Sequence, residues 1–161
     1  MIIIKMVNII TCFFKKLFYK VIYTKKLKFG KKVSFRKNFT INISKKGNIE
    51  IGNNVFFNND CSINSLQNIK IGDNSIFGEN VKIYDHNHCF SNKNELIRKQ
   101  GYSLGDVTIG KNCWICSNVV ILKGVKIGDN VVIGANCIIH NDVEENSIVK
   151  MDAKLIVEKI R

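Results

Sequence analysis

The stretch IYDHNHCF, residues 83–90, holds two of the three histidines in a chain of 161 residues. Histidine changes its protonation near neutral pH, so it can take a proton from a hydroxyl group as a general base. We predict that His88 is such a base, and that Asp85 or Glu95 orients its ring. His86 is expected to shape a substrate pocket or to face solvent.

A six-residue repeat surrounds this stretch. Ile or Phe opens twelve hexads, in runs that start at residues 51, 71 and 109. Position five is mostly small or β-branched, while Gly at position two and Asn at position four suit tight corners. Six residues make one short strand and one corner, so three hexads close a triangular coil. We predict an all-β solenoid, a parallel β-helix over residues 29–145, whose weaker first coil starts at Phe29, and a short tail over 146–161.

Residues 89–108 interrupt the hexads directly after His88. Such an excursion from a solenoid is usually a functional loop, although a tolerated surface insertion has the same signature. His88 stands where the solenoid edge meets this extruded loop, and a junction of that kind forms a cleft. This position is why His88, and not His86, is predicted to be the base.

The histidines and cysteines are poorly spaced for a metal. His140 lies two coils beyond His88, about 10 Å away within one chain, whereas catalytic zinc needs about three protein ligands at about 2.1 Å. Cys113 and Cys116 have C-x-x-C spacing without a second pair. No metal is expected, although a site shared between subunits stays open. Most cysteines are expected to pack as small hydrophobes, and reduced thiols suit a cytoplasmic protein.

The N-terminal segment, residues 1–28, is basic and amphipathic. Residues 1–46 carry 13 of the 25 Lys/Arg and none of the 13 Asp/Glu, so the other 115 residues have 12 basic and 13 acidic side chains. On a helical wheel one side holds Met6, Ile9, Ile10, Phe13, Phe14, Leu17 and Val21, and the other holds Lys5, Asn8, Cys12, Lys15, Lys16 and Tyr19. The apolar run is too short to span a bilayer.

Two interpretations of this segment stay open. The helix packs its apolar face on the solenoid or on another subunit, or it lies in an anionic membrane surface. Nucleic acid is not an expected partner, because the segment carries no known nucleic-acid motif.

The ordered set of motifs resembles a known family. IEIGNNVFFNND, IKIGDNSIFGENVKIYDHNH, DVTIGKNCWICSNVVILKGVKIGDNVVIGANCIIHNDV and the tail AKLIVEKI are similar to the hexapeptide-repeat acyltransferases over about residues 48–160. The galactoside and maltose O-acetyltransferases and the O-acetyltransferases of capsule and lipopolysaccharide synthesis are the most similar branches. The resemblance implies a left-handed β-helix, a homotrimer, acetyl-CoA as donor, and active sites between adjacent subunits.

The resemblance also implies roles for individual residues. His88 matches the family's catalytic histidine, and Asn58 matches an asparagine on the acceptor side. DHNH is similar to the polysaccharide-modifying members, which places His86 near the substrate. The residues that correspond to contacts with the coenzyme A donor are Trp114, Ser117, Ala135 and Lys154.

Two departures from the family pattern bear on the substrate and the donor. Leu66 stands near the position of an acidic acceptor-side residue in the galactoside branch, which argues against a galactoside acceptor. The usual GxPA turn before the tail reads KMDA, so contacts to the coenzyme A phosphates are expected to differ.

These features predict an acetyl-CoA-dependent O-acetyltransferase that modifies a hydroxyl of a sugar or a surface-polysaccharide precursor by direct transfer. Neutral His88 takes the hydroxyl proton, and an N–H near Ser117 stabilises the oxyanion. The alternatives are an acetyltransferase for a small molecule such as an antibiotic or an amino sugar, a metal-dependent hydratase, and a catalytically silent scaffold. The expected location is the cytoplasm, at the inner face of the membrane if the N-terminal helix binds lipid.

Overall fold

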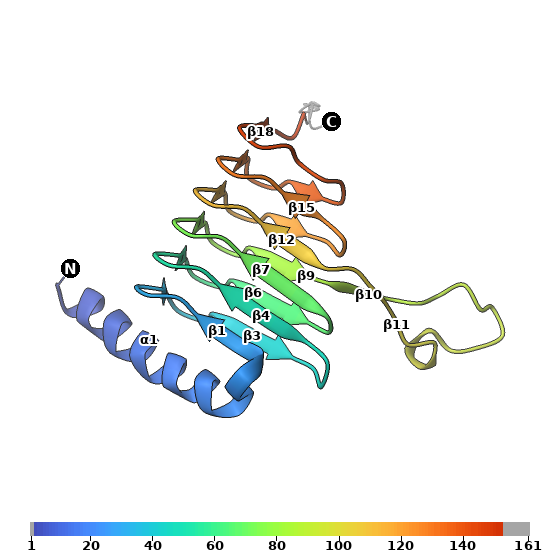
Figure 1. The fold of residues 1–161 in the computed structure, drawn as a ribbon, viewed down its shortest axis with the longest axis horizontal. Helices are drawn as coiled ribbons and strands as arrows, with labels where there is room; N and C mark the ends of the chain where they lie inside the picture. The colour runs from blue at the N-terminus through green and yellow to red at the C-terminus, as the bar shows by residue number, and fades with distance from the viewer. Residues whose placement is uncertain (1, 153–161) are drawn as a thin grey trace, which may run out of the picture.

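The computed structural model describes residues 2–152, and it places a helix before a stack of triangular coils (Figure 1). Helix α1 (Ile2–Tyr23) and the 3-10 turn η1 (Thr24–Lys26) come first. The first three coils comprise β1 (Leu27–Phe29), β2 (Ser34–Phe35) and β3 (Thr40–Ile43), then β4 (Asn48–Ile51), β5 (Phe56–Phe57) and β6 (Ser62–Ser65), then β7 (Asn68–Ile71), β8 (Ile76–Phe77) and β9 (Lys82–Tyr84).

A hairpin separates these coils from the rest of the solenoid. It comprises β10 (His86–His88), the 3-10 turn η2 (Ile97–Lys99) and β11 (Tyr102–Leu104). The later coils comprise β12 (Val107–Ile109), β13 (Trp114–Ile115) and β14 (Val120–Ile121), then β15 (Lys126–Ile127), β16 (Val132–Ile133) and β17 (Ile138–Ile139), and a last partial coil with β18 (Ile148–Val149).

Strands from successive coils pair in parallel and form three sheets along the solenoid. Their orders are β1-β4-β7-β12-β15, then β2-β5-β8-β13-β16-β18, then β3-β6-β9-β14-β17. We call them sheets A, B and C. The predicted parallel β-helix is therefore confirmed, and the weak hexad at Phe29 does begin a coil.

The corners use asparagine in the left-handed region of the backbone. Asn118, for example, has a φ of 60°. Its side chain accepts from Asn80 Nδ2 at 3.0 Å and donates to Asn136 Oδ1 at 3.1 Å, so the three amides form a ladder along one edge. A short polar side chain tolerates this conformation better than other non-glycine residues do.

The interior of the solenoid is mainly apolar. Inward positions of all three sheets carry mostly isoleucine, valine or phenylalanine that is almost fully buried. Phe35, Phe39, Phe57 and Phe77 stack through the first three coils, with neighbouring ring centroids 4.4 to 4.8 Å apart. Burying aromatic rings in contact stabilises the stack beyond area burial alone.

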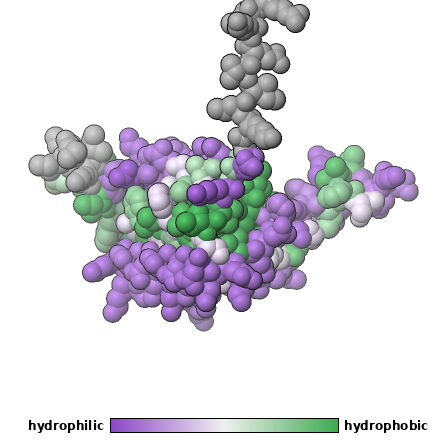
Figure 2. All heavy atoms as spheres, turned by 90° about the horizontal axis from the view of Figure 1, so that it is seen from above, coloured by the Kyte–Doolittle hydropathy of each residue, from purple (hydrophilic) through white to green (hydrophobic). Residues whose placement is uncertain are grey.

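The solenoid boundaries differ from those expected from the hexads. β1 starts at Leu27 and β18 extends to Val149, so part of the expected tail belongs to the solenoid. The excursion starts at His86, where β10 pairs antiparallel with β11, and β12 has already rejoined sheet A at Val107. In Figure 2, seen from the C-terminal end, this loop reaches out from one side of the body.

Helix α1 lies across the first coil (Figure 1). The burial of its side chains shows that its polar face points inward. Cys12 and Tyr19 are buried, and Lys15 and Lys16 are half-buried. Of the interpretations that the sequence left open, packing of the apolar face on the solenoid of the same chain is therefore wrong. The two sides of the helical wheel are as predicted, but the side in contact with the solenoid is the opposite one. Among the described residues no helix is long and apolar enough to cross a membrane.

Candidate active site

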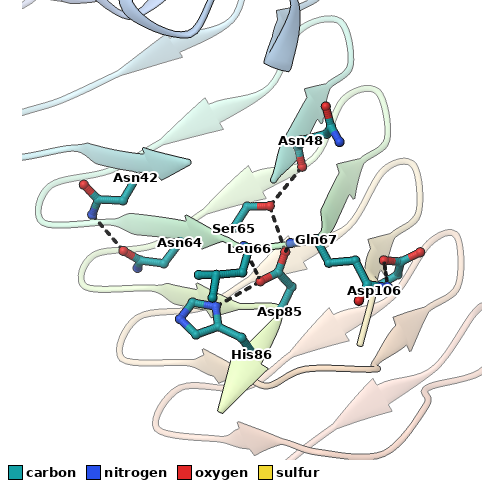
Figure 3. Close-up of polar contacts among 9 residues, drawn as sticks. All are labelled: Asn42, Asn48, Asn64, Ser65, Leu66, Gln67, Asp85, His86 and Asp106. Carbon is teal, nitrogen blue, oxygen red and sulfur yellow. Dashed lines mark hydrogen bonds and ion pairs between the residues drawn. The ribbon is translucent and has the colours of Figure 1, made fainter. Parts of the chain in front are cut away.

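The carboxylate of Asp85 is completely buried at the corner between sheets C and A. Its Oδ1 accepts from the Leu66 backbone N–H at 2.8 Å, and its Oδ2 accepts from Gln67 N–H at 2.8 Å and from Ser65 Oγ at 2.7 Å (Figure 3). Three donors offset the cost of removing this carboxylate from water. They come from the preceding coil, so Asp85 is fixed to the solenoid and not to the loop.

The ring of His86 is held by this buried carboxylate. Nδ1 of His86 lies 2.9 Å from Asp85 Oδ1, and the side chain of His86 is 16% exposed (Figure 3). When the carboxylate is ionised it only accepts, so a neutral His86 beside it carries its proton on Nδ1 and keeps a lone pair on Nε2. A neutral histidine with this tautomer is set up to take a proton at Nε2.

The two carboxylates predicted to orient His88 do not contact it. Asp85 contacts His86, which corrects the assignment of its partner. Glu95 lies in the exposed loop, where the described hydrogen bonds engage only its backbone, with Asn92 and Gln100. His88 packs instead on Tyr102 of the opposite hairpin strand, with ring centroids 4.5 Å apart.

Next to His86 the surface is hollowed by about 380 Å³. Its polar lining comes from Tyr23 at the end of α1, from Asn42 and Ser44 at β3, and from Asn64 of β6, together with His86. These amides, hydroxyls and a histidine suit a molecule rich in hydroxyl groups. His86, which was predicted to shape a substrate pocket, is one of the residues that line this hollow.

Sequence reasoning did not identify Tyr23, Asn42, Ser44 and Asn64. Asn42 and Asn64 occupy equivalent positions in successive coils, and Asn42 Nδ2 donates to Asn64 Oδ1 at 2.7 Å (Figure 3). A signal was present, because both asparagines are outward-facing strand residues and not the usual corner asparagines of the repeat.

The residues predicted to contact the donor gather elsewhere on the solenoid. Trp114 is 51% exposed on the outer face of sheet B, between Ile76 and Val132 of the neighbouring strands. Ser117 and Ala135 sit at the corner between sheets B and C, one coil apart. Lys154 lies outside the described residues.

Asn58, predicted on the acceptor side, is at this same B–C corner, where its Oδ1 accepts from Arg36 Nη1 at 3.2 Å. The predicted site residues therefore divide between two corners of one chain. His86 and its hollow are at the C–A corner, and Trp114, Ser117, Ala135 and Asn58 are on sheet B and its B–C corner.

The cysteines are all free, and most of them are buried. Burial raises the pKa of Cys61 to about 11 and also raises the pKa values of Cys113 and Cys116. A thiol with a raised pKa stays protonated at neutral pH and is a poor nucleophile. Among residues 2–152, no three His, Cys, Asp or Glu side chains group where they could hold a metal ion.

Known proteins agree with this fold and with the repeat. The family model for the bacterial transferase hexapeptide (six repeats) matches residues 106–141. The putative lipopolysaccharide biosynthesis O-acetyl transferase WbbJ of Escherichia coli K12 is 30% identical over 138 residues, 77% of this chain and 70% of WbbJ. The chain belongs to the hexapeptide-repeat acetyltransferases.

Other hexapeptide-repeat acetyltransferases match over a smaller part of their length. The galactoside O-acetyltransferase of Escherichia coli K12 is 41% identical over 103 residues, which are 63% of this chain. The chain spans about half, 49%, of that relative.

Solved structures of this family superimpose on the solenoid. A maltose O-acetyltransferase from Clostridium difficile 630 has a TM-score of 0.68 at 33% identity, over 80% of this chain and 67% of its own. A galactoside acetyltransferase in complex with coenzyme A has a TM-score of 0.61 at 34% identity, over 77% of this chain and 64% of its own. The fold is thus the left-handed β-helix of the hexapeptide-repeat acetyltransferases.

Proposed function

We propose that this protein transfers an acetyl group from acetyl-CoA to a hydroxyl of a sugar or a surface-polysaccharide precursor. The observation that carries the proposal is the Asp85–His86 pair, which presents a free Nε2 beside a hollow lined with amides and hydroxyls. The names of the relatives support it, since they include O-acetyltransferases for galactosides and for lipopolysaccharide biosynthesis. The structure of a galactoside acetyltransferase with coenzyme A supports the donor.

The general base in this proposal is His86. Its Nε2 takes the proton of the acceptor hydroxyl as the oxygen attacks the acetyl carbonyl, and Asp85 stabilises the imidazolium that forms. Acetyl-CoA supplies the activated thioester, and coenzyme A leaves as the thiol. His88 stays a second candidate, because it lies in the same hairpin strand and its ring packs against Tyr102.

The division of the site between two corners supports a homotrimer. Sheet B presents an outward row in register that includes Phe56, Ile76, Trp114 and Val132. The equivalent row of sheet A is mostly charged, and its members are Lys28, Glu50, Lys70, Thr108 and Lys126. An apolar outer row on one sheet beside a charged row on another fits a subunit contact along sheet B.

In such a trimer the B–C corner of one subunit meets the C–A corner of the next. Trp114 and its apolar neighbours then form a surface for the pantetheine arm, and an N–H near Ser117 faces the oxyanion. Asn58 of the same corner approaches the acceptor held by His86 of the other subunit. No step in this scheme uses a metal or a nucleic acid.

The location proposed for this enzyme is the cytoplasm, because six free thiols suit a reducing compartment. The basic N-terminal segment also predicts peripheral contact with the inner face of the membrane. The surface of α1 would make that contact.

The test is thiol release from acetyl-CoA over a panel of sugars and glycan fragments, with His86→Ala and His88→Ala compared with the wild type. We expect acceptor-dependent release that falls by about 10²-fold or more in His86→Ala and by much less in His88→Ala. A loss confined to His88→Ala would move the base to His88. Equal rates in all three proteins would remove both histidines from the mechanism.

A further inference from the structure

The outward face of α1 is a continuous apolar surface. Met6, Val7, Ile9, Ile10, Phe13, Phe14, Leu17, Phe18, Val21 and Ile22 are each 48% to 69% exposed. Single exposed apolar residues are ordinary, but ten along one helix form a surface that needs a partner.

Specific contacts on the polar side fix this orientation. Lys15 Nζ donates to the Phe39 carbonyl at 2.7 Å, and Lys16 Nζ donates to the Val33 carbonyl at 2.5 Å. Tyr19 and Tyr23 add hydroxyl contacts to the first coil, to the Phe39 carbonyl and the Ile41 carbonyl.

These contacts satisfy backbone groups that the first coil leaves open. A solenoid ends on strands without a further neighbour, and unpaired carbonyls at that end need donors. Turning α1 over to bury its apolar face would remove these donors. The apolar face therefore stays outward while the solenoid end is capped.

The charged residues that line the two grooves beside the apolar face are all basic. No acidic residue occurs before Glu50, whereas 13 Lys/Arg precede it. A groove of about 530 Å³ between α1 and the first coil combines apolar side chains such as Phe14 and Phe18 with the cationic Arg36 and Lys37. A second groove of about 430 Å³ lies along the other side of the helix, with Ile9 and Phe13 in its lining.

We infer that the outward face of α1 docks this protein on an anionic lipid bilayer, with the helix lying in the headgroup region. The apolar side chains enter the acyl boundary, and the flanking cations contact lipid phosphates. An apolar ridge between cationic grooves is complementary to the boundary between lipid headgroups and acyl chains. A helix that faces only solvent would not be stabilised by such a pattern. A second copy of this basic segment would bring like charges together, which opposes helix-to-helix association.

Docking places the candidate active site beside the lipid. Tyr23 ends α1 and also lines the hollow next to His86, so the hollow begins at the coil that the helix covers. A glycan carried on a lipid in the same bilayer is then within reach, a consequence that rests on the proposed function.

The experiment is cosedimentation of the full chain with vesicles of phosphatidylcholine, alone or mixed with phosphatidylglycerol. We expect binding to the mixed vesicles that weakens as salt is added. Phe13→Gln/Leu17→Gln removes two outward side chains and keeps good helix formers, so its partitioning should fall by about tenfold or more. Lys20 of α1 and Lys25 of η1 are exposed cations near the end of the helix. Lys20→Gln/Lys25→Gln should lower binding to mixed vesicles and leave weak binding to phosphatidylcholine unchanged.

Leu96→Gln/Ile97→Gln is the matched control, because these two side chains are equally apolar and 60% and 56% exposed, but lie in the extruded loop. It should bind vesicles as the wild type does. Light scattering gives the mass of each variant, and circular dichroism checks its folding.

Absence of vesicle binding by the wild type, or equal binding by Phe13→Gln/Leu17→Gln, would overturn the inference. A changed mass of that variant without vesicle binding would identify the face as a subunit contact, and would overturn it as well. Vesicle binding does not depend on catalysis, so failure of the proposed acetyl transfer leaves this result interpretable.

Discussion

Asp85 and His86, neighbours in the chain, face each other through side chains, with Oδ1 2.9 Å from Nδ1. Consecutive strand residues normally point to opposite faces. Here β9 ends at Tyr84 and β10 begins at His86, so the chain turns away from the solenoid between them. Because of that turn, Asp85 stays in the interior and His86 lies at the start of the hairpin, next to the Asp85 carboxylate.

The first prediction concerns Asp85 as a positioning residue. Asp85→Asn retains the size of the side chain but turns the histidine partner from a carboxylate into an amide, which does not stabilise an imidazolium. We expect kcat to fall by about 10- to 100-fold while the KM for acetyl-CoA stays near the wild-type value, as steady-state thiol release measures.

A purely structural role for Asp85 predicts a different result. Asp85→Asn leaves buried donors poorly matched and should cost about 1–3 kcal/mol of unfolding free energy. Ser65→Ala, which removes one of those donors and leaves the carboxylate on His86, is the control. If Ser65→Ala and Asp85→Asn lowered kcat equally, the contact with His86 would have no special importance.

The hexad pattern predicted most of the fold but not this pair. Regular spacing placed Ile and Phe inside and Asn at corners, because strand alternation and corner geometry depend on local residue types. The surroundings of Asp85 depend on Leu66 and Gln67, which lie in the hexad just before the frame slips by two residues ahead of the run that starts at residue 71. That slip was visible in the sequence. Its structural consequence could not be predicted, because the sequence does not show which residue of the next coil lies beside the extra residues.

A helical wheel could not predict which face of α1 contacts the solenoid either. The wheel separated the two faces correctly, but it left open whether the apolar face packs on protein or lies in a membrane surface. The decisive factor was the set of open carbonyls at the first coil, including those of Val33 and Phe39. A sequence does not show which carbonyls lack a partner, because pairing depends on tertiary structure.

A second prediction concerns the corner ladder at Asn118. Asn118→Gly removes both side-chain hydrogen bonds but allows a φ of 60°, whereas Asn118→Ala loses the bonds and adds backbone strain. Alanine should therefore be less stable than glycine by about 1 kcal/mol. Urea unfolding of the two variants gives the difference, and an alanine variant as stable as the glycine one would contradict the role of the left-handed corner.

A third prediction concerns the thiols. Cys61 has a pKa of about 11, and Cys113 is buried at the equivalent repeat position. Both should react with a thiol reagent only on unfolding, whereas Cys89, half-buried in the extruded loop, should react in the native protein. Mass spectrometry after brief labelling locates each adduct. Rapid native labelling of Cys113 would revive a redox or metal role for the C-x-x-C pair.

The fourth prediction concerns stability in acid. Asp73 Oδ1 accepts from the Asn53 backbone N–H at 2.7 Å, and this bond, followed by one from the Asn53 side chain, lowers the pKa of Asp73. A carboxyl whose folded pKa is below its unfolded value stabilises the fold above the unfolded pKa. That contribution disappears as pH falls through the folded pKa.

Asp73→Asn separates this charge effect from the hydrogen bond. The amide oxygen still accepts from Asn53 N–H but does not titrate, so the variant should lose less stability on acidification than the wild type. The measurement is the urea midpoint of both proteins at neutral pH and below the usual aspartate range. The wild type should be the more stable at neutral pH, and the gap should close in acid. A gap that stays constant with pH would show that Asp73 contributes through shape and not through its charge.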